Sequence, residues 1–139
     1  MRISIPREHE RQSSPENVNQ LINTILKNES EVDREKEHFW LIGLKSSNTI
    51  KFIELVHLGG LDRTTIDIKV IMRTAVYNGV ASIIIAHNHP GGTLKPSDDD
   101  LRSTKAIKTA CDVLEIVLLD HVINADGQYF SMKEGGILP

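Results

Sequence analysis

An apolar segment that ends in two histidines constrains the fold of this chain more than any other part of its sequence. Residues 80–86 read Val-Ala-Ser-Ile-Ile-Ile-Ala, so both faces of a strand built from them would be apolar. Such a strand belongs in a sheet that is covered on both sides, usually by helices. The chain continues with His87-Asn88-His89-Pro90 and Gly91-Gly92, where proline and glycine end the strand and let the backbone reverse. The sequence therefore predicts a buried strand with polar side chains at its end.

The segments around this strand predict one α/β domain. Apolar residues recur at helical spacing after Ser14-Pro15, from about Thr65 and after Ser97, while other segments have strand-like length and composition. The expected order is a helix from 14, strands 39–44 and 50–58, a helix from about 65, strand 80–86, a helix from 97, and strands 115–123 and 129–132. This order favours a mixed central β-sheet flanked by helices. We expect residues 1–13 to be a flexible N-terminal arm and residues 14–139 to form a single domain.

Composition narrows the class of protein further. A chain of 139 residues with 40% hydrophobic and 25% charged residues is typical of one globular domain. Nucleic acid is a possible partner, but the net charge of -3 does not support it, because nucleic-acid-binding domains are usually basic. No apolar stretch approaches the roughly 18 residues that span a membrane, so we expect no membrane association. Cys111 is the single cysteine, which excludes a Cys-rich zinc site. A single cysteine and the lack of a secretory signal at the start together predict a cytoplasmic protein.

Two imidazoles and a carboxylate follow the apolar strand at short spacing. His87 and His89 are two residues apart, so in extended backbone their rings point to the same side. Asp100 lies in the first turn of the next predicted helix and can point back toward them. Two histidines and one carboxylate are ligands that a catalytic zinc ion takes, with the fourth position left for a water whose pKa falls to about 7. The sequence predicts a Zn²⁺ site at these three residues and hence a metal-dependent hydrolase, although such ligands can also bind iron or nickel.

Helix capping offers another interpretation of part of this pattern. Ser97-x-x-Asp100 with three acidic residues in one turn is also how a helix satisfies its first N–H groups and its dipole. A His-x-His pair alone can equally be structural. We favour the metal site because a buried strand end, His-x-His-Pro, a Gly-Gly turn and a Ser-x-x-Asp helix start seldom coincide.

This combination resembles the JAB/MPN metalloenzymes, also called JAMM, whose motif is an upstream Glu, His-x-His, seven residues (here 90–96) and Ser-x-x-Asp. The RadC branch is the most similar, on Ala86-His87-Asn88-His89-Pro90, Pro96-Ser97 and Leu119-Asp120-His121-Val122-Ile123. The resemblance covers roughly residues 35–134. It implies a layered fold like that of cytidine deaminases, with zinc bound by His87, His89 and Asp100. RadC-like proteins often carry a helix-hairpin-helix segment before this domain, and we expect a short stand-alone form because the arm is too short for one.

The resemblance also implies catalytic roles. Ser97 would orient the water or support the developing oxyanion. Glu37, just before the strand at 39–44, occupies the place of the general base, a role typically worth about 10²–10⁴-fold in rate. Glu35 and Glu54 remain alternatives for the base, and Glu37 could instead be a solvated charge.

Several functions are compatible with such a site. The first is a zinc-dependent metallopeptidase or isopeptidase that acts on a peptide or protein conjugate. Because RadC is associated with DNA repair, the alternative is a DNA-repair accessory or binding module that has a metal site but no catalytic activity. A third possibility is a scaffold protein that has lost its activity. A zinc nucleobase deaminase is disfavoured because its Pro-Cys-x-x-Cys motif needs two cysteines.

Residues outside the motif receive supporting roles. We expect Asp120 and His121 to lie in the core or to support the ligands, and a carboxylate to hold one ligand histidine in place. We expect His38, His57 and Cys111 to be structural.

Overall fold

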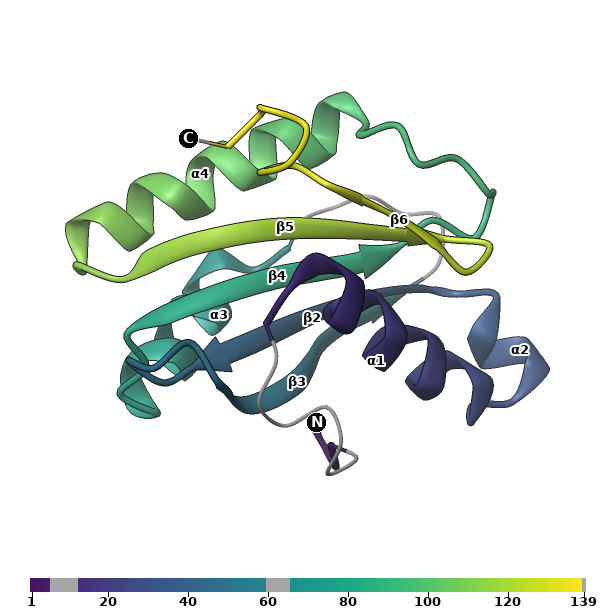
Figure 1. The fold of residues 1–139 in the computed structure, drawn as a ribbon, viewed down its shortest axis with the longest axis horizontal. Coiled ribbons are helices and arrows are strands. Elements are labelled where there is room, and N and C mark those ends of the chain that lie inside the picture. The colour runs from purple at the N-terminus through teal and green to yellow at the C-terminus, as the bar shows by residue number, and fades with distance from the viewer. Residues whose placement is uncertain (6–12, 60–65, 139) are drawn as a thin grey trace.

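The computed structural model describes residues 1–5, 13–59 and 66–138. A six-stranded mixed sheet forms the centre, with strand order β1-β3-β2-β4-β5-β6 and helices packed against it (Figure 1). β4 and β5 are parallel, and the other neighbouring strands are antiparallel. The elements are β1 (Arg2–Ile3), α1 (Pro15–Lys27), α2 (Glu31–Arg34), β2 (Glu37–Leu44), β3 (Ile50–Gly59), α3 (Ile68–Tyr77), β4 (Ser82–Asn88), α4 (Asp98–Val113), β5 (Val117–Ala125) and β6 (Gln128–Ser131). The predicted α/β class with a mixed central sheet is confirmed.

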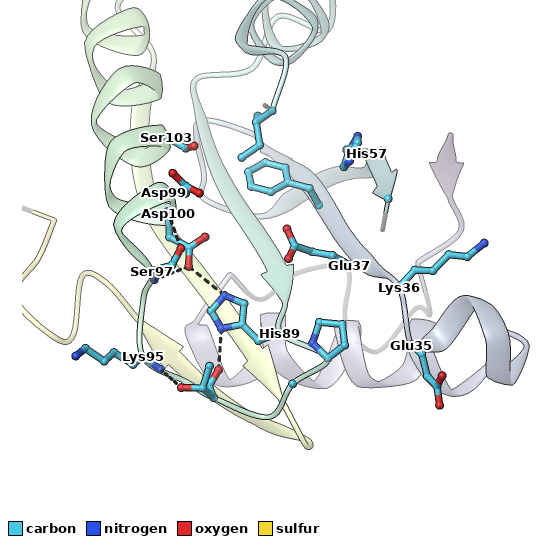
Figure 2. Close-up of a pocket in the computed structure, with 16 residues that line it drawn as sticks. Glu35, Lys36, Glu37, His57, His89, Lys95, Ser97, Asp99, Asp100 and Ser103 are labelled. Atoms are coloured by element: carbon cyan, nitrogen blue, oxygen red, sulfur yellow. Dashed lines mark hydrogen bonds and ion pairs between the residues drawn. The ribbon is translucent and has the colours of Figure 1, made fainter. Parts of the chain in front are cut away.

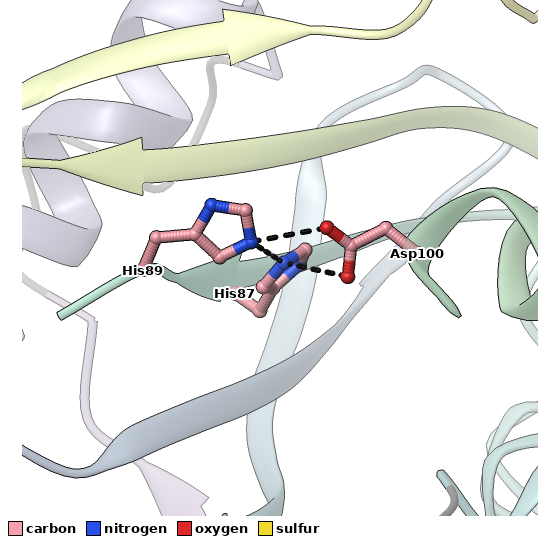
Figure 3. A group of neighbouring side chains, drawn as sticks. All are labelled: His87, His89 and Asp100. Carbon is pink, nitrogen blue, oxygen red and sulfur yellow. Dashed lines mark hydrogen bonds and ion pairs between the residues drawn. The ribbon is translucent and has the colours of Figure 1, made fainter. Parts of the chain in front are cut away.

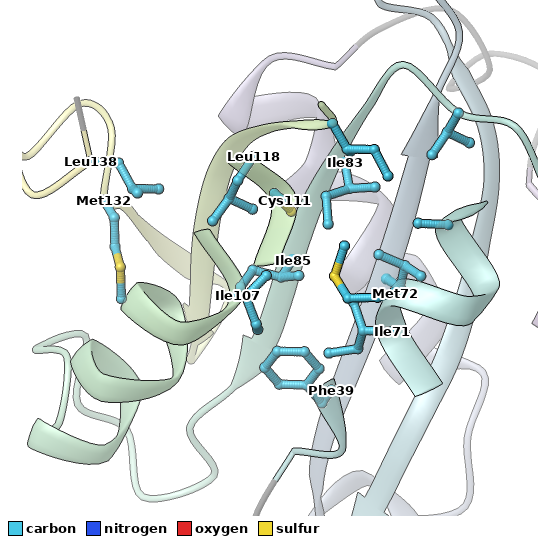
Figure 4. Close-up of a cluster of buried hydrophobic side chains, with 14 of the residues drawn as sticks. Phe39, Ile71, Met72, Ile83, Ile85, Ile107, Cys111, Leu118, Met132 and Leu138 are labelled. Carbon is cyan, nitrogen blue, oxygen red and sulfur yellow. The ribbon is translucent and has the colours of Figure 1, made fainter. Parts of the chain in front are cut away.

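The two central strands are buried along their length, as the apolar segment predicted. Every residue of β4 is buried, and in β2 every residue after Glu37 is buried. Alternate side chains of these strands enter two separate cores. One core contains Phe39, Ile83 and Ile85 beneath α3 and α4 (Figure 4), and the other contains Trp40 and Ile84 beneath α1. The sheet therefore has helices on both faces, and its middle is rigidly packed on both sides.

α1 and α3 begin at residues whose side chains cap the first turn, and of these two caps the sequence predicts the one at Ser14. Ser14 accepts a hydrogen bond from the Asn17 N–H at the start of α1, and Pro15 occupies the first turn. Asp67 caps α3 in the same way. In the parts of the chain that the structure describes, no helix combines the length and the apolar character that are needed to cross a membrane.

The parallel pair β4–β5 determines where a site can form. Parallel strands end at the same edge of the sheet, and α4, which connects these two, begins close to the end of β4 (Figure 1). Side chains from the end of β4, the first turn of α4 and the start of the antiparallel neighbour β2 therefore meet at one edge. Ligands commonly bind at this edge of α/β sheets.

Two short elements differ from the expectation. The charged connection at 28–36 contains α2, a single turn that Ser30 caps. Arg2–Ile3, in the predicted arm, forms β1 on the free edge of β3. Residues 6–12 and Thr65 lie outside the described residues, so the flexible arm and the predicted start of the second helix stay predictions.

Candidate metal centre

The backbone places both histidines at the end of β4. His87 lies within the strand, and the N–H of His89 donates to the Asn124 carbonyl at 2.7 Å, so β5 still holds the chain after β4 ends. A turn follows, in which the Gly92 N–H donates to the His89 carbonyl. Gly92 has a φ of +88°, and a Cβ there would lie 2.9 Å from Asp126 Oδ2, so this turn requires glycine.

The three predicted ligands converge (Figure 3). His87 Nε2 lies 2.8 Å from His89 Nε2 and 3.2 Å from Asp100 Oδ1, and His89 Nε2 lies 3.0 Å from Asp100 Oδ2. Tetrahedral zinc with bonds of about 2.0–2.1 Å places neighbouring donor atoms about 3.3 Å apart. The observed separations are a few tenths of an ångström shorter, so small outward movements would admit an ion. Two imidazoles and one carboxylate are also a donor set that suits zinc, and the residues fit the metal that the sequence predicts.

Asp100 is both a candidate ligand and part of a helix cap. Ser97 Oγ accepts the Asp100 N–H at 3.0 Å, and Asp100 Oδ2 accepts the Ser97 N–H at 2.9 Å, which together make a capping box at the start of α4. The same oxygen contacts His89, and the other oxygen faces His87. The capping interpretation and the metal interpretation are therefore compatible, because the cap fixes the carboxylate in the position that a ligand needs.

The electrostatics of the three groups favour a charged carboxylate. Burial alone would raise the pKa of Asp100, but its contacts with the His87 and His89 rings outweigh burial and hold the pKa well below its usual value. The hydrogen bond to Asp100 raises the pKa of His89, although partial burial opposes this. The carboxylate is thus ionised at neutral pH, as a metal ligand must be.

Each ligand histidine is held by a hydrogen bond at its other ring nitrogen. His89 Nδ1 lies 2.7 Å from the Thr93 carbonyl, and His87 Nδ1 lies 2.7 Å from His121 Nε2. Our expectation of a carboxylate behind a ligand histidine is wrong, because an imidazole and a backbone carbonyl occupy these places. Burial, and then the neighbouring His87, lower the pKa of His121 well below its usual value, so this ring is neutral.

A cavity of about 410 Å³ opens beside the ligands (Figure 2). Its lining includes His89, Ser97 and Asp100, with Phe39 and Ile66 as apolar walls. It is large enough for a short peptide segment or a side chain and lies within the size range of known ligand pockets.

Glu37 lies in this cavity. Its carboxylate points toward the side that holds His89 and Asp100, whereas Glu35 also borders the cavity but turns away from them in the same view (Figure 2). Glu54 forms an ion pair with Arg2 on the far side of β3, at 3.1 Å. Of the three candidates for the base, Glu37 has the position that the role requires, and its role stays a prediction.

Asn88, between the two histidines, holds the strand that carries Glu37. Its Oδ1 accepts the N–H of His38 at 2.6 Å, and its Nδ2 donates to the Lys36 carbonyl at 3.1 Å. The buried amide thus bonds the backbone on both sides of Glu37. Asn88 therefore joins β4 to β2.

The remaining predicted residues divide into core and cavity. Asp120 is buried and accepts hydrogen bonds from Ser131 and from the N–H groups of His121 and Lys133, which fixes the end of β6. His38 and Cys111 are buried, as expected of structural residues. His57 is exposed and borders the cavity, so it is not part of the core, and its structural role stays a prediction.

Comparison with known proteins gives a consistent family. The family model described as RadC-like JAB domain matches residues 12–137. Similar proteins include those named UPF0758 protein from Flavobacterium johnsoniae (37% identical over 101 residues), Porphyromonas gingivalis (38% over 107) and Streptococcus agalactiae (39% over 102). The alignments cover 73%, 76% and 73% of this chain and 44%, 47% and 45% of those proteins. The chain spans less than half the length of the relatives that it matches.

Proposed function

Because this chain belongs to the RadC-like JAB domain family, we propose that it is a zinc-dependent hydrolase that cleaves peptide or isopeptide bonds. The observation that carries the proposal is the convergence of His87, His89 and Asp100, of which His89 and Asp100 line a cavity that Glu37 also lines. A hydrolase needs an electrophilic centre, a base and room for the substrate, and this edge of the sheet provides places for all three.

His87, His89 and Asp100 would hold the ion. Bound there, zinc would polarise the substrate carbonyl and lower the pKa of a water molecule to about 7. Glu37 takes a proton from the attacking water and later delivers it to the leaving amine. Ser97 Oγ accepts the Asp100 N–H, so its own hydroxyl hydrogen points elsewhere and can be donated to the oxygen that gains negative charge. Phe39 and Ile66 provide apolar surface for the substrate beside the reacting bond.

The charge of the cavity bears on the DNA-binding alternative. Among the residues that the structure describes, four carboxylates border it, from Glu35, Glu37, Asp99 and Asp100, against two lysines, Lys36 and Lys95. Phosphate backbones bind where cations dominate. A peptide substrate is therefore favoured over DNA.

The proposal also includes a cytoplasmic location. A single buried cysteine that forms no disulfide suits a reducing compartment.

The first experiment is elemental analysis of protein purified without chelators, which should give one equivalent of zinc. Peptides and ubiquitin-like conjugates are then screened for cleavage, and a salt-dependent DNA titration is run in parallel. A metal-free wild-type protein, or tight DNA binding that weakens steeply with salt and no cleavage, would contradict the proposal.

Glu37→Gln tests the base. Since the amide cannot accept the proton, we expect kcat to fall about 10²–10⁴-fold while the zinc content is unchanged. Glu35→Gln is the matched control, because it removes a charge from the same cavity border without removing the group that faces the ligands. Equal rates for Glu37→Gln and wild type would show that another residue is the base.

A further inference from the structure

A row of hydrogen bonds runs behind the candidate metal centre from the Asp100 carbonyl to His87, whose other ring nitrogen faces the Asp100 carboxylate. Thr104 Oγ1 lies 2.7 Å from the Asp100 carbonyl and 2.6 Å from His121 Nδ1. His121 Nε2 lies 2.7 Å from His87 Nδ1, and His87 Nε2 faces the Asp100 carboxylate at 3.2 Å. We propose that this row, through Thr104 and His121, determines which nitrogen of His87 is free to bind metal, so that both are positioning residues of the metal centre.

The direction of the hydrogens follows from the groups at one end. The Asp100 carbonyl can only accept, and Met132 Sδ, at 3.5 Å from the same hydroxyl, is likewise an acceptor. Two oxygen atoms that lie 2.7 Å apart need a hydrogen between them, and the carbonyl has none, so the Thr104 hydroxyl donates to the Asp100 carbonyl. Its oxygen then accepts, and the atom that faces it, His121 Nδ1, must carry a hydrogen.

The rest of the row follows from the chemistry of imidazole. A neutral imidazole has one N–H, so His121 with its hydrogen on Nδ1 has an unprotonated Nε2. That nitrogen accepts from His87 Nδ1, which leaves His87 Nε2 unprotonated and its lone pair directed at His89 and Asp100. Metal binding by histidine requires this form. The opposite orientation of the row would place a hydrogen on Nε2, where it would block the ion.

Burial makes the row effective. His87, Thr104 and His121 are 1%, 4% and 0% exposed, so water does not compete for their hydrogen bonds. Thr104 and His121 come from α4 and β5, and the row therefore ties the helix that carries Asp100 to the strand beside β4. The inference rests on the metal-binding part of the proposed function, but the row itself can be tested without metal.

Nitrogen-15 NMR of the histidine rings at pH 8 distinguishes the two orientations in the metal-free protein. We expect the Nδ1–H form for both His121 and His87. An Nε2–H form of His121 in the folded wild type would overturn the proposal, whether or not the protein binds zinc. A wild-type protein with the expected tautomers that binds no zinc would overturn the proposed function and leave the row established.

Substitutions at Thr104 then test the consequence for metal binding. Thr104→Val keeps the shape and removes the hydroxyl, and we expect an Nε2–H signal to appear for His121 and zinc affinity to fall about 10–100-fold. Thr104→Ser should restore both. Thr109→Val is the matched control, because Thr109 lies on the same helix and its hydroxyl donates to the Lys105 carbonyl in the same local pattern. A role in folding alone would lower the melting temperature of Thr104→Val without changing the tautomers or the affinity of the folded protein, and that result would refute the inference.

Discussion

Replacing Asp100 by alanine removes one group that should stabilise the protein in two different ways, with and without metal. In the metal-free protein the carboxylate caps α4 through the Ser97 N–H and contacts His87 and His89. A lost cap costs about 0.5–2 kcal/mol, and a hydrogen bond to a charged group is worth about 1.5–3 kcal/mol. Asp100 is only 14% exposed, so solvent screens these interactions little. We expect Asp100→Ala to lower the free energy of unfolding by about 2–3 kcal/mol without metal.

The two pKa shifts determine where this loss is largest. Folding lowers the pKa of Asp100, so its contribution is present above its unfolded value of 3.8 and is lost as the pH falls further. Folding raises the pKa of His89, so its contribution is complete below 6.5 and is lost as the pH rises through the folded value. The metal-free difference between wild type and Asp100→Ala should therefore be greatest between about pH 4 and 6.5.

Zinc should add a second difference at higher pH, where the imidazoles are unprotonated. Zinc at 100 times its Kd stabilises a folded protein by about 2.7 kcal/mol, which for a chain of this length raises Tm by about 10 °C. Thermal unfolding with and without zinc at pH 7.5 should show this rise for wild type and little or none for Asp100→Ala.

Asp99→Ala is the control for this experiment. It removes an acidic group from the same turn of α4, where Asp99 pairs with Arg102, and should keep the full zinc effect. If Asp100→Ala gains as much from zinc as Asp99→Ala does, the carboxylate is not a ligand and the proposed site is refuted.

Two further predictions concern buried groups near and far from the site. Asn88→Ala removes both hydrogen bonds that flank Glu37, so the His38 N–H and the Lys36 carbonyl lose their partner. We expect the free energy of unfolding, measured in urea, to fall by about 2–4 kcal/mol. An unchanged urea midpoint would show that these bonds are dispensable. Burial, and to a lesser extent the charge of Asp112, raise the pKa of the Cys111 thiol to about 11. Ellman's reagent at pH 8 should therefore label this thiol only after the protein is unfolded in guanidinium. Rapid labelling of the native protein would contradict the burial of Cys111.

Most of the fold follows from local patterns, and the departures have a physical reason. The capped helix at Ser14 and the buried strand at residues 80–86 carry strong signals, because capping and burial leave characteristic residue types. α2 has four residues, none of them buried, and depends on Ser30 and on Arg34, which donates to the Leu26 carbonyl at the end of α1. Such a turn is stabilised by its neighbours and has no apolar periodicity, so the pattern that predicts the longer helices does not predict it.

The ligands of the candidate site were predictable because the chemistry restricts their residue types and spacing. The residues that hold these ligands in place were not predictable. Thr104 has no spacing signal, since its partner His121 lies on another element. The Thr93 carbonyl could be provided by any residue at that position. For Asn88, its place between two ligands was a signal, but its partners on β2 become visible only once the strands are paired.

The shared use of Asp100 has a consequence for how such sequences evolve. Ser97 and Asp100 together cap α4, and this gain of about 0.5–2 kcal/mol exists without any ion. A descendant that lost metal binding would still be selected to retain the serine and the aspartate. Within this family, an intact Ser-x-x-Asp is therefore by itself weak evidence that a metal site is retained.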